Sequence, residues 1–153
     1  MITIRKAVPG DLNFIEAHAY RLLDFGPPDW RNQAEMTPAD IRHISDALLS
    51  DDPKRQVFIA IDETAERIGF SHLTLQQDYY SNEWQAHLTD LVVIASVEGK
   101  GVGRRFLEHA DEWARENNCR WITLNVFDKN QHAQQVYEKL GYQKEWVRYL
   151  KLL

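Results

Sequence analysis

Three glycines at alternate positions lie among basic residues in the second half of the chain. This glycine loop (residues 97–105) reads Val-Glu-Gly-Lys-Gly-Val-Gly-Arg-Arg and joins an apolar run to a helical pattern. Glycines let the main chain turn sharply and bring its N–H groups close to a ligand. A helix start adds unpaired N–H donors and a partial positive charge. With the charges of Lys100, Arg104 and Arg105, these features predict a cradle for linked phosphates.

Two other phosphate-binding patterns fit the glycine loop poorly. A P-loop needs Gly-Lys followed by Ser or Thr, whereas Gly101 and Val102 follow Lys100 here. A dinucleotide-binding loop needs G-x-G-x-x-G after the first strand of the fold, and Phe106 takes the place of its last glycine. Because a glycine loop alone is a weak signal, an ordinary turn between a strand and a helix remains the alternative.

Size and charge restrict the class of protein. The chain has 153 residues, 44% of them apolar, and a net charge of −5, which predicts one domain over residues 1–153 with a hydrophobic core. The acidic balance disfavours nucleic acid as a partner, because nucleic-acid binding needs a basic face. No apolar run approaches the roughly 20 residues of a membrane span, and the first residues lack a signal-peptide core. We therefore expect a cytoplasmic protein with no membrane partner.

The cysteine and most histidines indicate neither a nucleophile nor a metal. Cys119 is the single cysteine, so an internal disulfide is impossible, and without a local histidine partner it is expected to be a buried structural thiol. Five histidines show no metal-ligand spacing with one another: His18, His43, His72, His109 and His132. We expect no metal site.

The elements around the glycine loop alternate between strand and helix patterns. Strands are expected at residues 2–4, 57–61, 68–75, 87–94 and 121–126, with a closing strand from Tyr142 onward. Helices are expected after residues 9–11, after Thr37, after the glycine loop, and over residues 131–140. Thr37 is the expected N-cap of the second helix, with Pro38 as its first helical residue and Asp40 as the capping-box partner. The run from Leu91 to Ile94 is typical of a strand buried on both faces. The unit over residues 88–126 predicts two parallel strands, hence a mixed α/β fold.

Two blocks of this sequence resemble the GNAT family of N-acetyltransferases. The first is Asp90-Leu91-Val92-Val93 followed by Gly99-Lys100-Gly101-Val102-Gly103, and the second runs from Leu124-Asn125-Val126 through Asn130 to Gly141-Tyr142. Gly101 and Gly103 match the two small positions of the family's acetyl-CoA motif, whereas Glu98 stands where the family usually has Arg or Gln. The resemblance implies a mixed, mostly antiparallel central sheet with a splayed parallel pair, flanked by helices.

The resemblance also implies a site for acetyl-CoA as co-substrate. The pantetheine arm would pair with the main chain near Val93 and Ile94, and N–H groups from Gly99 to Arg104 would hold the pyrophosphate. Asn130 would contact the arm or cap its helix. The positions implied to bind the coenzyme are Val92, Val93, Ile94, Gly99, Lys100, Gly101, Val102, Gly103, Arg104, Asn125, Asn130, Ala133 and Tyr137.

Three residues are candidates for proton transfer. Tyr137 matches the family's tyrosine, which implies an acid for the departing thiolate; the alternative is an aromatic residue packed on an amphipathic helix. Asp90 is the first candidate for the base, because an unpaired charge in a buried strand is costly; the alternative is an ion pair with a lysine or arginine. His87 is the second candidate, because its ordinary pKa near 6.5 suits proton transfer; the alternative is a partly exposed strand residue.

Aromatic residues are expected beside the acceptor amine. Phe25, Trp30, Tyr79 and Trp84, with the neighbouring Tyr80, lie in or beside the two loops predicted to border the pocket, and Asp24, Asp29 and Asp78 flank them. Aromatic walls with carboxylates suit a cationic amine, and ordinary loop packing is the alternative.

These features predict an N-acetyltransferase that moves an acetyl group from acetyl-CoA to a primary amine of a small molecule or peptide, by direct attack in a ternary complex. A non-catalytic module of the same fold that binds acyl-CoA and regulates a partner is the alternative, which Glu98 favours slightly. The closing strand could pair across a homodimer.

Overall fold

Five strands form a single sheet in the computed structural model, which describes residues 1–153. The strands are β1 (Thr3–Lys6), β2 (Arg55–Ile61), β3 (Arg67–Gln77), β4 (Trp84–Val93) and β5 (Ile122–Leu124), in that spatial order. Neighbours run antiparallel except β4 and β5, which are parallel. This topology confirms the mixed α/β fold with one parallel pair.

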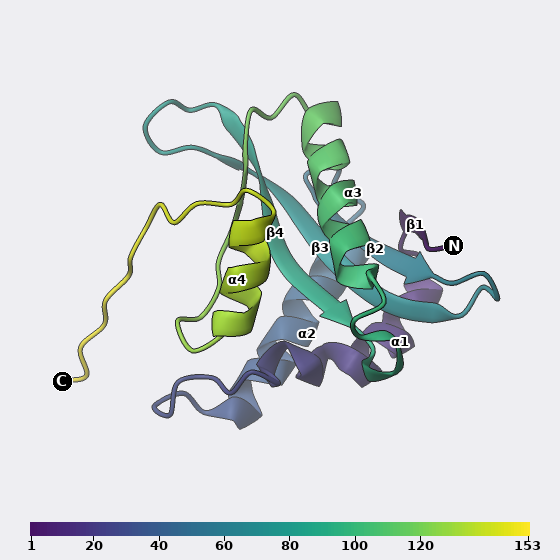
Figure 1. Ribbon diagram of the computed structural model, residues 1–153, viewed down its shortest axis with the longest axis horizontal. Helices are drawn as coiled ribbons and strands as arrows, with labels where there is room; N and C mark the ends of the chain where they lie inside the picture. Colours follow the sequence, from purple (N-terminus) through teal and green to yellow (C-terminus); the bar gives the residue numbers. More distant parts are fainter.

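Helices cover both faces of the sheet (Figure 1). On one face lie α1 (Leu12–His18) and α2 (Gln33–Leu49), whose buried residues pack against Val57, Ile59 and Phe70. On the other face lie α3 (Val102–Glu116) and α4 (Gln131–Lys139). They pack against strand residues that point to this side of the sheet, such as Phe58 and Leu88. Three short 3-10 helices link these elements: η1 (Pro9–Asp11), η2 (Ala19–Leu23) and η3 (Ala95–Val97).

A buried carboxylate fastens the start of the chain to the sheet. Asp11 is fully buried and accepts hydrogen bonds from Arg5 at 2.8 and 2.9 Å and from Arg67 Nε at 2.6 Å. The hydrogen bonds from Arg5 hold the pKa of Asp11 well below its usual range. Because the charge is fully paired, its burial is tolerated, and β1, η1 and β3 are held together.

The helix start predicted with Thr37 as N-cap is wrong. Helix α2 begins at Gln33, and its N-cap is Asn32, five residues before Thr37; the Asn32 side chain accepts a hydrogen bond from Ala34 N–H at 3.1 Å. Asparagine is among the best N-cap residues, and the exposed Pro38 is accommodated inside the helix. Asp40 therefore lies in mid-helix rather than in a capping box.

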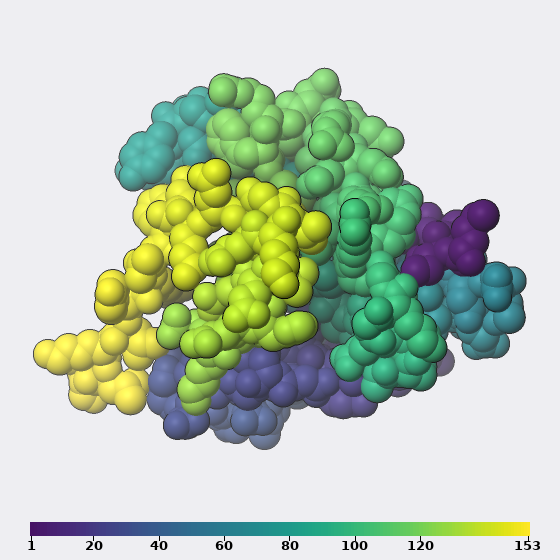
Figure 2. Space-filling model, in the orientation of Figure 1, coloured from purple at the N-terminus to yellow at the C-terminus, as the bar shows by residue number.

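The end of the chain also differs from the prediction. Strand β5 covers only Ile122–Leu124, and residues from Tyr142 onward form no strand. The last main-chain hydrogen bond joins Tyr142 N–H to the Tyr137 carbonyl at 3.0 Å. The C-terminal tail (residues 143–153) then leads away from the body (Figures 1 and 2), because no strand of the same chain pairs with it.

None of the helices combines the length and the apolar character that a membrane span requires.

Candidate active site

The glycine loop presents a set of main-chain donors without partners. Gly99 and Gly101 have φ values of 73° and 85°, a left-handed conformation that favours glycine, and Gly101 is the N-cap of α3. Five N–H groups make no hydrogen bond within the protein: those of Gly99, Gly101, Val102, Gly103 and Arg104. Because they cluster at the positive end of a 15-residue helix, they form a cradle suited to an anion.

The charged side chains around this cradle are not equivalent. Arg104 pairs with Glu108 at 3.0 Å and Arg105 with Glu112 at 3.3 Å, both along the surface of α3. Lys100 makes no ion pair, so its ammonium is the free cation at the loop. Glu98 pairs with Arg21 of η2.

Next to the loop, β4 separates from β5. The two strands pair only from Ala86 to Leu88, opposite Ile122 to Leu124. The register of β4 with β3 shifts here, because Leu88 lies opposite Leu73 and Asp90 opposite His72. Thr89 is thus an extra, bulged residue, and bulges bend a strand and increase its twist. The strands therefore splay at the position that the resemblance implied.

Beyond the bulge, alternate peptide groups of β4 face the splay. Ile94 N–H donates to the Ile68 carbonyl of β3 at 3.0 Å. Antiparallel pairing alternates, so the N–H and carbonyl of Leu91 and Val93 face away from β3. Those of Ile94 and Val92 face β3. The prediction of a run buried on both faces is also wrong, because only Val92 is fully buried where β5 has left.

Tyr137 projects from α4 on the same face as α3. It packs against the core cluster that includes Leu88 and Leu107, and burial raises the pKa of its phenol. Its ring lies 5.7 Å from that of Tyr142. At the start of α4, the Asn130 side chain accepts a hydrogen bond from Ala133 N–H at 3.3 Å, so the capping role expected of Asn130 is present.

On the opposite face, under α2, lies a cluster of titratable groups. Asp90 Oδ2 lies 3.0 Å from His72 Nδ1, and the two side chains are 10% and 0% exposed. Asp40 of α2 faces the same region, and burial together with the charge of Asp90 raises the pKa of Asp40 to about 6. The His43 ring lies 5.1 Å from that of His72. Asp90 thus has a histidine partner rather than the predicted lysine or arginine.

His87, the second candidate for the base, is almost fully buried. Its Nδ1 lies 2.8 Å from Thr123 Oγ1 on β5, and burial lowers its pKa. The expected alternative of a partly exposed strand residue is therefore wrong. His87 lies on the α2 face at the last paired residues of β4, before the splay.

The sequence did not single out Asp40 or His72 for proton transfer. A signal exists for Asp40, because it shares a helix face with Ile44 and Ala47, both buried in the core. A carboxylate on such an apolar stripe needs a reason. For His72, the signal depends on the strand register, which the bulge shifts.

The predicted acceptor residues divide into two groups. Phe25 stacks on Phe127 at 5.3 Å, and the Arg31 guanidinium lies 4.3 Å from the Trp30 ring, so Phe25 and Trp30 border the loop after β5. Tyr79, 86% exposed beside Tyr80, occupies the tip of the β3–β4 hairpin. This tip lies at the other end of the molecule from the loop before α2 (Figure 1), so the structure does not bring the two loops together.

Trp84 and the three flanking aspartates are already engaged. The Lys54 ammonium lies 4.6 Å from the Trp84 ring. Asp24 pairs with Arg21 at 3.2 Å and Asp29 with Lys129 at 3.0 Å. Asp78 accepts hydrogen bonds within its own loop, from Ser81 and Tyr80, which lower its pKa. Asp78 and Trp84 thus make these contacts within the protein itself.

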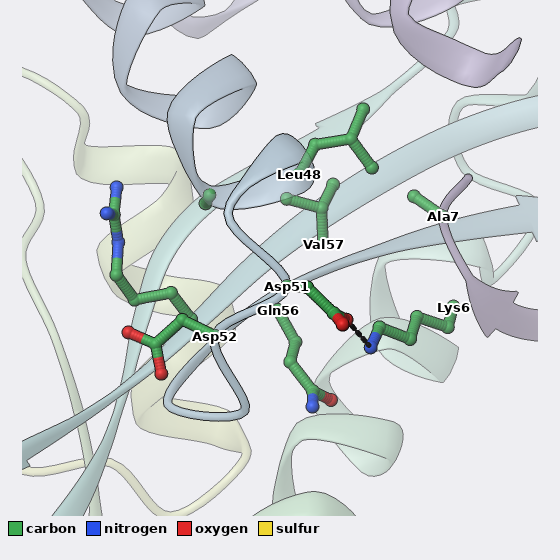
Figure 3. A pocket seen from close by; sticks show the side chains of 9 residues that line it. Lys6, Ala7, Leu48, Asp51, Asp52, Gln56 and Val57 are labelled. Atoms are coloured by element: carbon green, nitrogen blue, oxygen red, sulfur yellow. Dashed lines mark ion pairs between the residues drawn. The ribbon is translucent and has the colours of Figure 1, made fainter. Parts of the chain in front are cut away.

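One further hollow lies apart from the splay. It is lined by residues of β1, β2 and the end of α2, among them Leu48, Gln56 and Val57 (Figure 3). Lys6 Nζ and Asp51 Oδ1 face each other across it at 3.8 Å. Cys119 is half-buried, its thiol contacts the Asn117 carbonyl at 3.8 Å, and burial raises the pKa of the thiol.

Comparison with known proteins agrees with this geometry. Residues 18–142 match the sequence profile of the "Acetyltransferase (GNAT) family". The chain is 32% identical over 89 residues to the uncharacterized N-acetyltransferase YhfO of Bacillus subtilis (strain 168). The matched residues make up 58% of this chain and 60% of YhfO. The chain thus spans less than two thirds of that relative's length.

Two solved structures share the fold over nearly the whole chain. A variant of the BH1408 protein from Bacillus halodurans superposes with a TM-score of 0.78 at 22% identity, over 99% of both chains. The aminoglycoside N-acetyltransferase AAC(6')-Iy, in complex with CoA, superposes with a TM-score of 0.76 at 20% identity, over 99% of this chain and 95% of that one. By its fold, its splayed strands and its match over residues 18–142, the chain belongs to the GNAT family of acetyltransferases.

Proposed function

We propose that the protein is an N-acetyltransferase that moves an acetyl group from acetyl-CoA to a primary amine of a small molecule or peptide. The observation that carries the proposal is the cradle of five unpartnered N–H groups beside the splayed end of β4. A pyrophosphate matches these donors and the free Lys100, and an extended pantetheine arm matches the edge of β4 at Leu91 and Val93, which no strand covers. The fold neighbour AAC(6')-Iy, solved with CoA, supports this choice of anion.

The fit of the coenzyme can be judged at Gly103. A Cβ added there would meet only Val93 Cγ2, at 3.9 Å, so the space in front of the helix start is open. Gly99 to Arg104 would hold the phosphates, and Asn125, Asn130 and Ala133 would border the arm near α4. When bound, the coenzyme supplies an activated acetyl group as a thioester.

The two faces of the sheet would carry different parts of the reaction. Tyr137 lies on the α3 and α4 face and Asp90 on the α2 face, and the splay between β4 and β5 connects them. The amine would approach from the α2 face and the coenzyme from the other. This arrangement supports direct attack in a ternary complex.

Each proton then has a route. The ammonium form of the acceptor gives one proton to the Asp90 carboxylate, which the buried His72 orients. The amine nitrogen attacks the thioester carbonyl carbon, a C–N bond forms and the C–S bond breaks. Val93 N–H faces the splay and would donate to the carbonyl oxygen as negative charge develops. The Tyr137 hydroxyl, kept protonated by its raised pKa, would protonate the departing thiolate. The second proton, which the nitrogen loses as the amide forms, would restore the phenol.

A direct test is to incubate the protein with acetyl-CoA and a panel of amines and to follow thiol release. We expect turnover with at least one primary amine and saturable binding of acetyl-CoA in calorimetry. Tight binding of acetyl-CoA with no turnover on any amine would instead support a non-catalytic acyl-CoA-binding module. Absence of acetyl-CoA binding would contradict both functions.

We also propose that the C-terminal tail pairs with a second copy of the chain. Five of its apolar side chains, Trp146, Val147, Tyr149, Leu150 and Leu152, are between 57% and 90% exposed. Strand β5 has β4 on one edge and no strand on the other. Exchange of two such tails onto the free β5 edges would bury on the order of 1,000 Å² of apolar surface, the scale of a specific interface.

The oligomeric state tests this pairing. Light scattering after gel filtration should give the mass of a dimer, and Tyr149→Ser with Leu150→Ser should give a monomer, because the substituted side chains are exposed in the single chain. A monomeric unaltered protein, including one whose tail folds back on its own β5, would contradict the proposal.

A further inference from the structure

One arginine side chain joins three separate parts of the molecule. Arg21 of η2 is only 12% exposed. Its Nε donates to the main-chain carbonyl of Val93 at 2.8 Å, its Nη2 donates to the carboxylate of Glu98, and its Nη1 lies 3.2 Å from the carboxylate of Asp24. Each of the three guanidinium nitrogens thus faces a different acceptor.

The three acceptors lie along the proposed coenzyme site and at the start of the neighbouring loop. Val93 is the last residue of β4, and its carbonyl faces the splay. Glu98 immediately precedes Gly99, the first unpartnered donor of the cradle. Asp24 begins the loop that contains Phe25 and Trp30. A shift of Arg21 would therefore move the end of β4 and the start of the phosphate cradle together.

The charge of this group also matters. An unpaired Glu98 would place a carboxylate beside a site for a pyrophosphate, and like charges in contact repel. With Arg21 as its partner, that carboxylate is neutralised and turned toward η2. Glu98 is thus compatible with an anion site because a cation from a distant segment pairs with it.

We propose that Arg21 is a positioning residue for acetyl-CoA, which fixes the Val93 carbonyl and neutralises Glu98 next to the phosphate cradle. The inference rests on the proposed function, since it concerns the same site. An arginine is required, because the single ammonium of a lysine cannot reach three acceptors in a fixed plane.

The test combines substitutions at both ends of the pair. We expect Arg21→Gln to weaken acetyl-CoA binding about tenfold in calorimetry, while the KM for the amine changes little. Adding Glu98→Gln to that variant should restore part of the affinity, because the unpaired carboxylate is removed. A residue that merely maintained the fold would not be rescued by the loss of its partner. Thermal unfolding shows whether each variant is folded.

A second pair of variants does not disturb Arg21. Glu98 is 63% exposed, so its substitution is compatible with folding. Glu98→Asp keeps the charge but is too short for the contact, and should weaken acetyl-CoA binding several-fold; Glu98→Gln keeps the length and should bind as the unaltered protein does.

Two results would overturn the inference while the proposed function stands. The first is that Arg21→Gln binds acetyl-CoA as tightly as the original protein. The second is that Glu98→Asp does so. Failure of the unaltered protein to bind acetyl-CoA would overturn the proposed function and this inference with it.

Discussion

His72 and Asp90 face each other across the β3–β4 pair, with Nδ1 of the ring 3.0 Å from Oδ2 of the carboxylate. His72 is fully buried, and its Nε2 has no hydrogen-bond partner within the protein. With its proton on Nδ1, the ring would donate to the carboxylate and leave Nε2 as an unused acceptor. In that tautomer the ring orients the carboxylate of Asp90 toward the splay.

Replacement of Asp90 by asparagine should lower kcat by about 100-fold or more, because the amide cannot accept the proton of the ammonium. The side chain keeps its size, so the KM for acetyl-CoA should change little. Steady-state kinetics with both substrates measures the effect. His87→Gln is the matched control on the same strand and face, and a larger loss in that variant than in Asp90→Asn would show that His87 is the base.

Replacement of Tyr137 by phenylalanine should lower kcat by about 100-fold while acetyl-CoA affinity persists, because only the proton donor for the thiolate is lost. The loss should shrink with an acetyl thioester whose thiol is much more acidic than that of coenzyme A, since its thiolate leaves without protonation. Rates with the two donors measure the effect.

Tyr142→Phe is the control for that experiment. The Tyr142 hydroxyl is buried without a hydrogen-bond partner, and its ring lies next to that of Tyr137. Removal of this hydroxyl should leave kcat unchanged. Equal losses in the two variants would indicate a packing effect and contradict the assignment of Tyr137 as the acid.

Replacement of Gly103 by glutamate should abolish acetyl-CoA binding while the protein stays folded. The added Cβ meets only Val93 Cγ2 at 3.9 Å, which is an ordinary contact, so no steric clash is expected. The loss of binding would come from the glutamate carboxylate, which places negative charge in the cradle and repels the phosphates. Calorimetry with acetyl-CoA measures the loss. Gly10→Glu, at a glycine with open space around it, is the control. Unaltered affinity in Gly103→Glu would place the phosphates elsewhere.

The parts of the site that were predicted from the sequence are those set by neighbouring residues. The glycine loop is such a part, because the left-handed Gly99 and Gly101 and the start of α3 lie within a few residues of each other. The antiparallel β2–β3 hairpin is another, and its turn is formed by Asp62, which accepts hydrogen bonds from Thr64 and Glu66.

The parts that were missed depend on contacts between distant residues. The His72–Asp90 pair needs the bulge at Thr89, and one residue more or less in the register would turn Asp90 to the other face. Arg21 and Glu98 are 77 positions apart, so nothing local to Glu98 indicates its partner. The tail has the composition of a strand, but a strand forms only where it pairs with an edge, and no strand of the chain pairs with this tail.

Replacement of Asp40 by asparagine should stabilise the protein at neutral pH and not at acidic pH. The pKa of Asp40 is raised to about 6 by burial and by the charge of Asp90, above its ordinary value of 3.8. Between pH 3.8 and pH 6 the carboxyl of Asp40 ionises in the unfolded chain but stays protonated in the folded one, so the free energy of unfolding falls as the pH rises. Above pH 6 the full cost of ionising the buried carboxyl is present. Asparagine carries no charge and avoids that penalty.

Thermal or urea unfolding at pH 4 and pH 7.5 measures this difference. We expect Asp40→Asn to raise the free energy of unfolding at pH 7.5 by about 1–2 kcal/mol, a value discounted for solvent screening. The gain should be much smaller at pH 4, where the folded carboxyl is protonated and the unfolded one is only partly ionised. Asp46→Asn, at an exposed position of the same helix, is the control for helix propensity. An equal gain at both pH values would mean that Asp40 is not held close to Asp90, because only that proximity and burial make its ionisation unfavourable in the folded state.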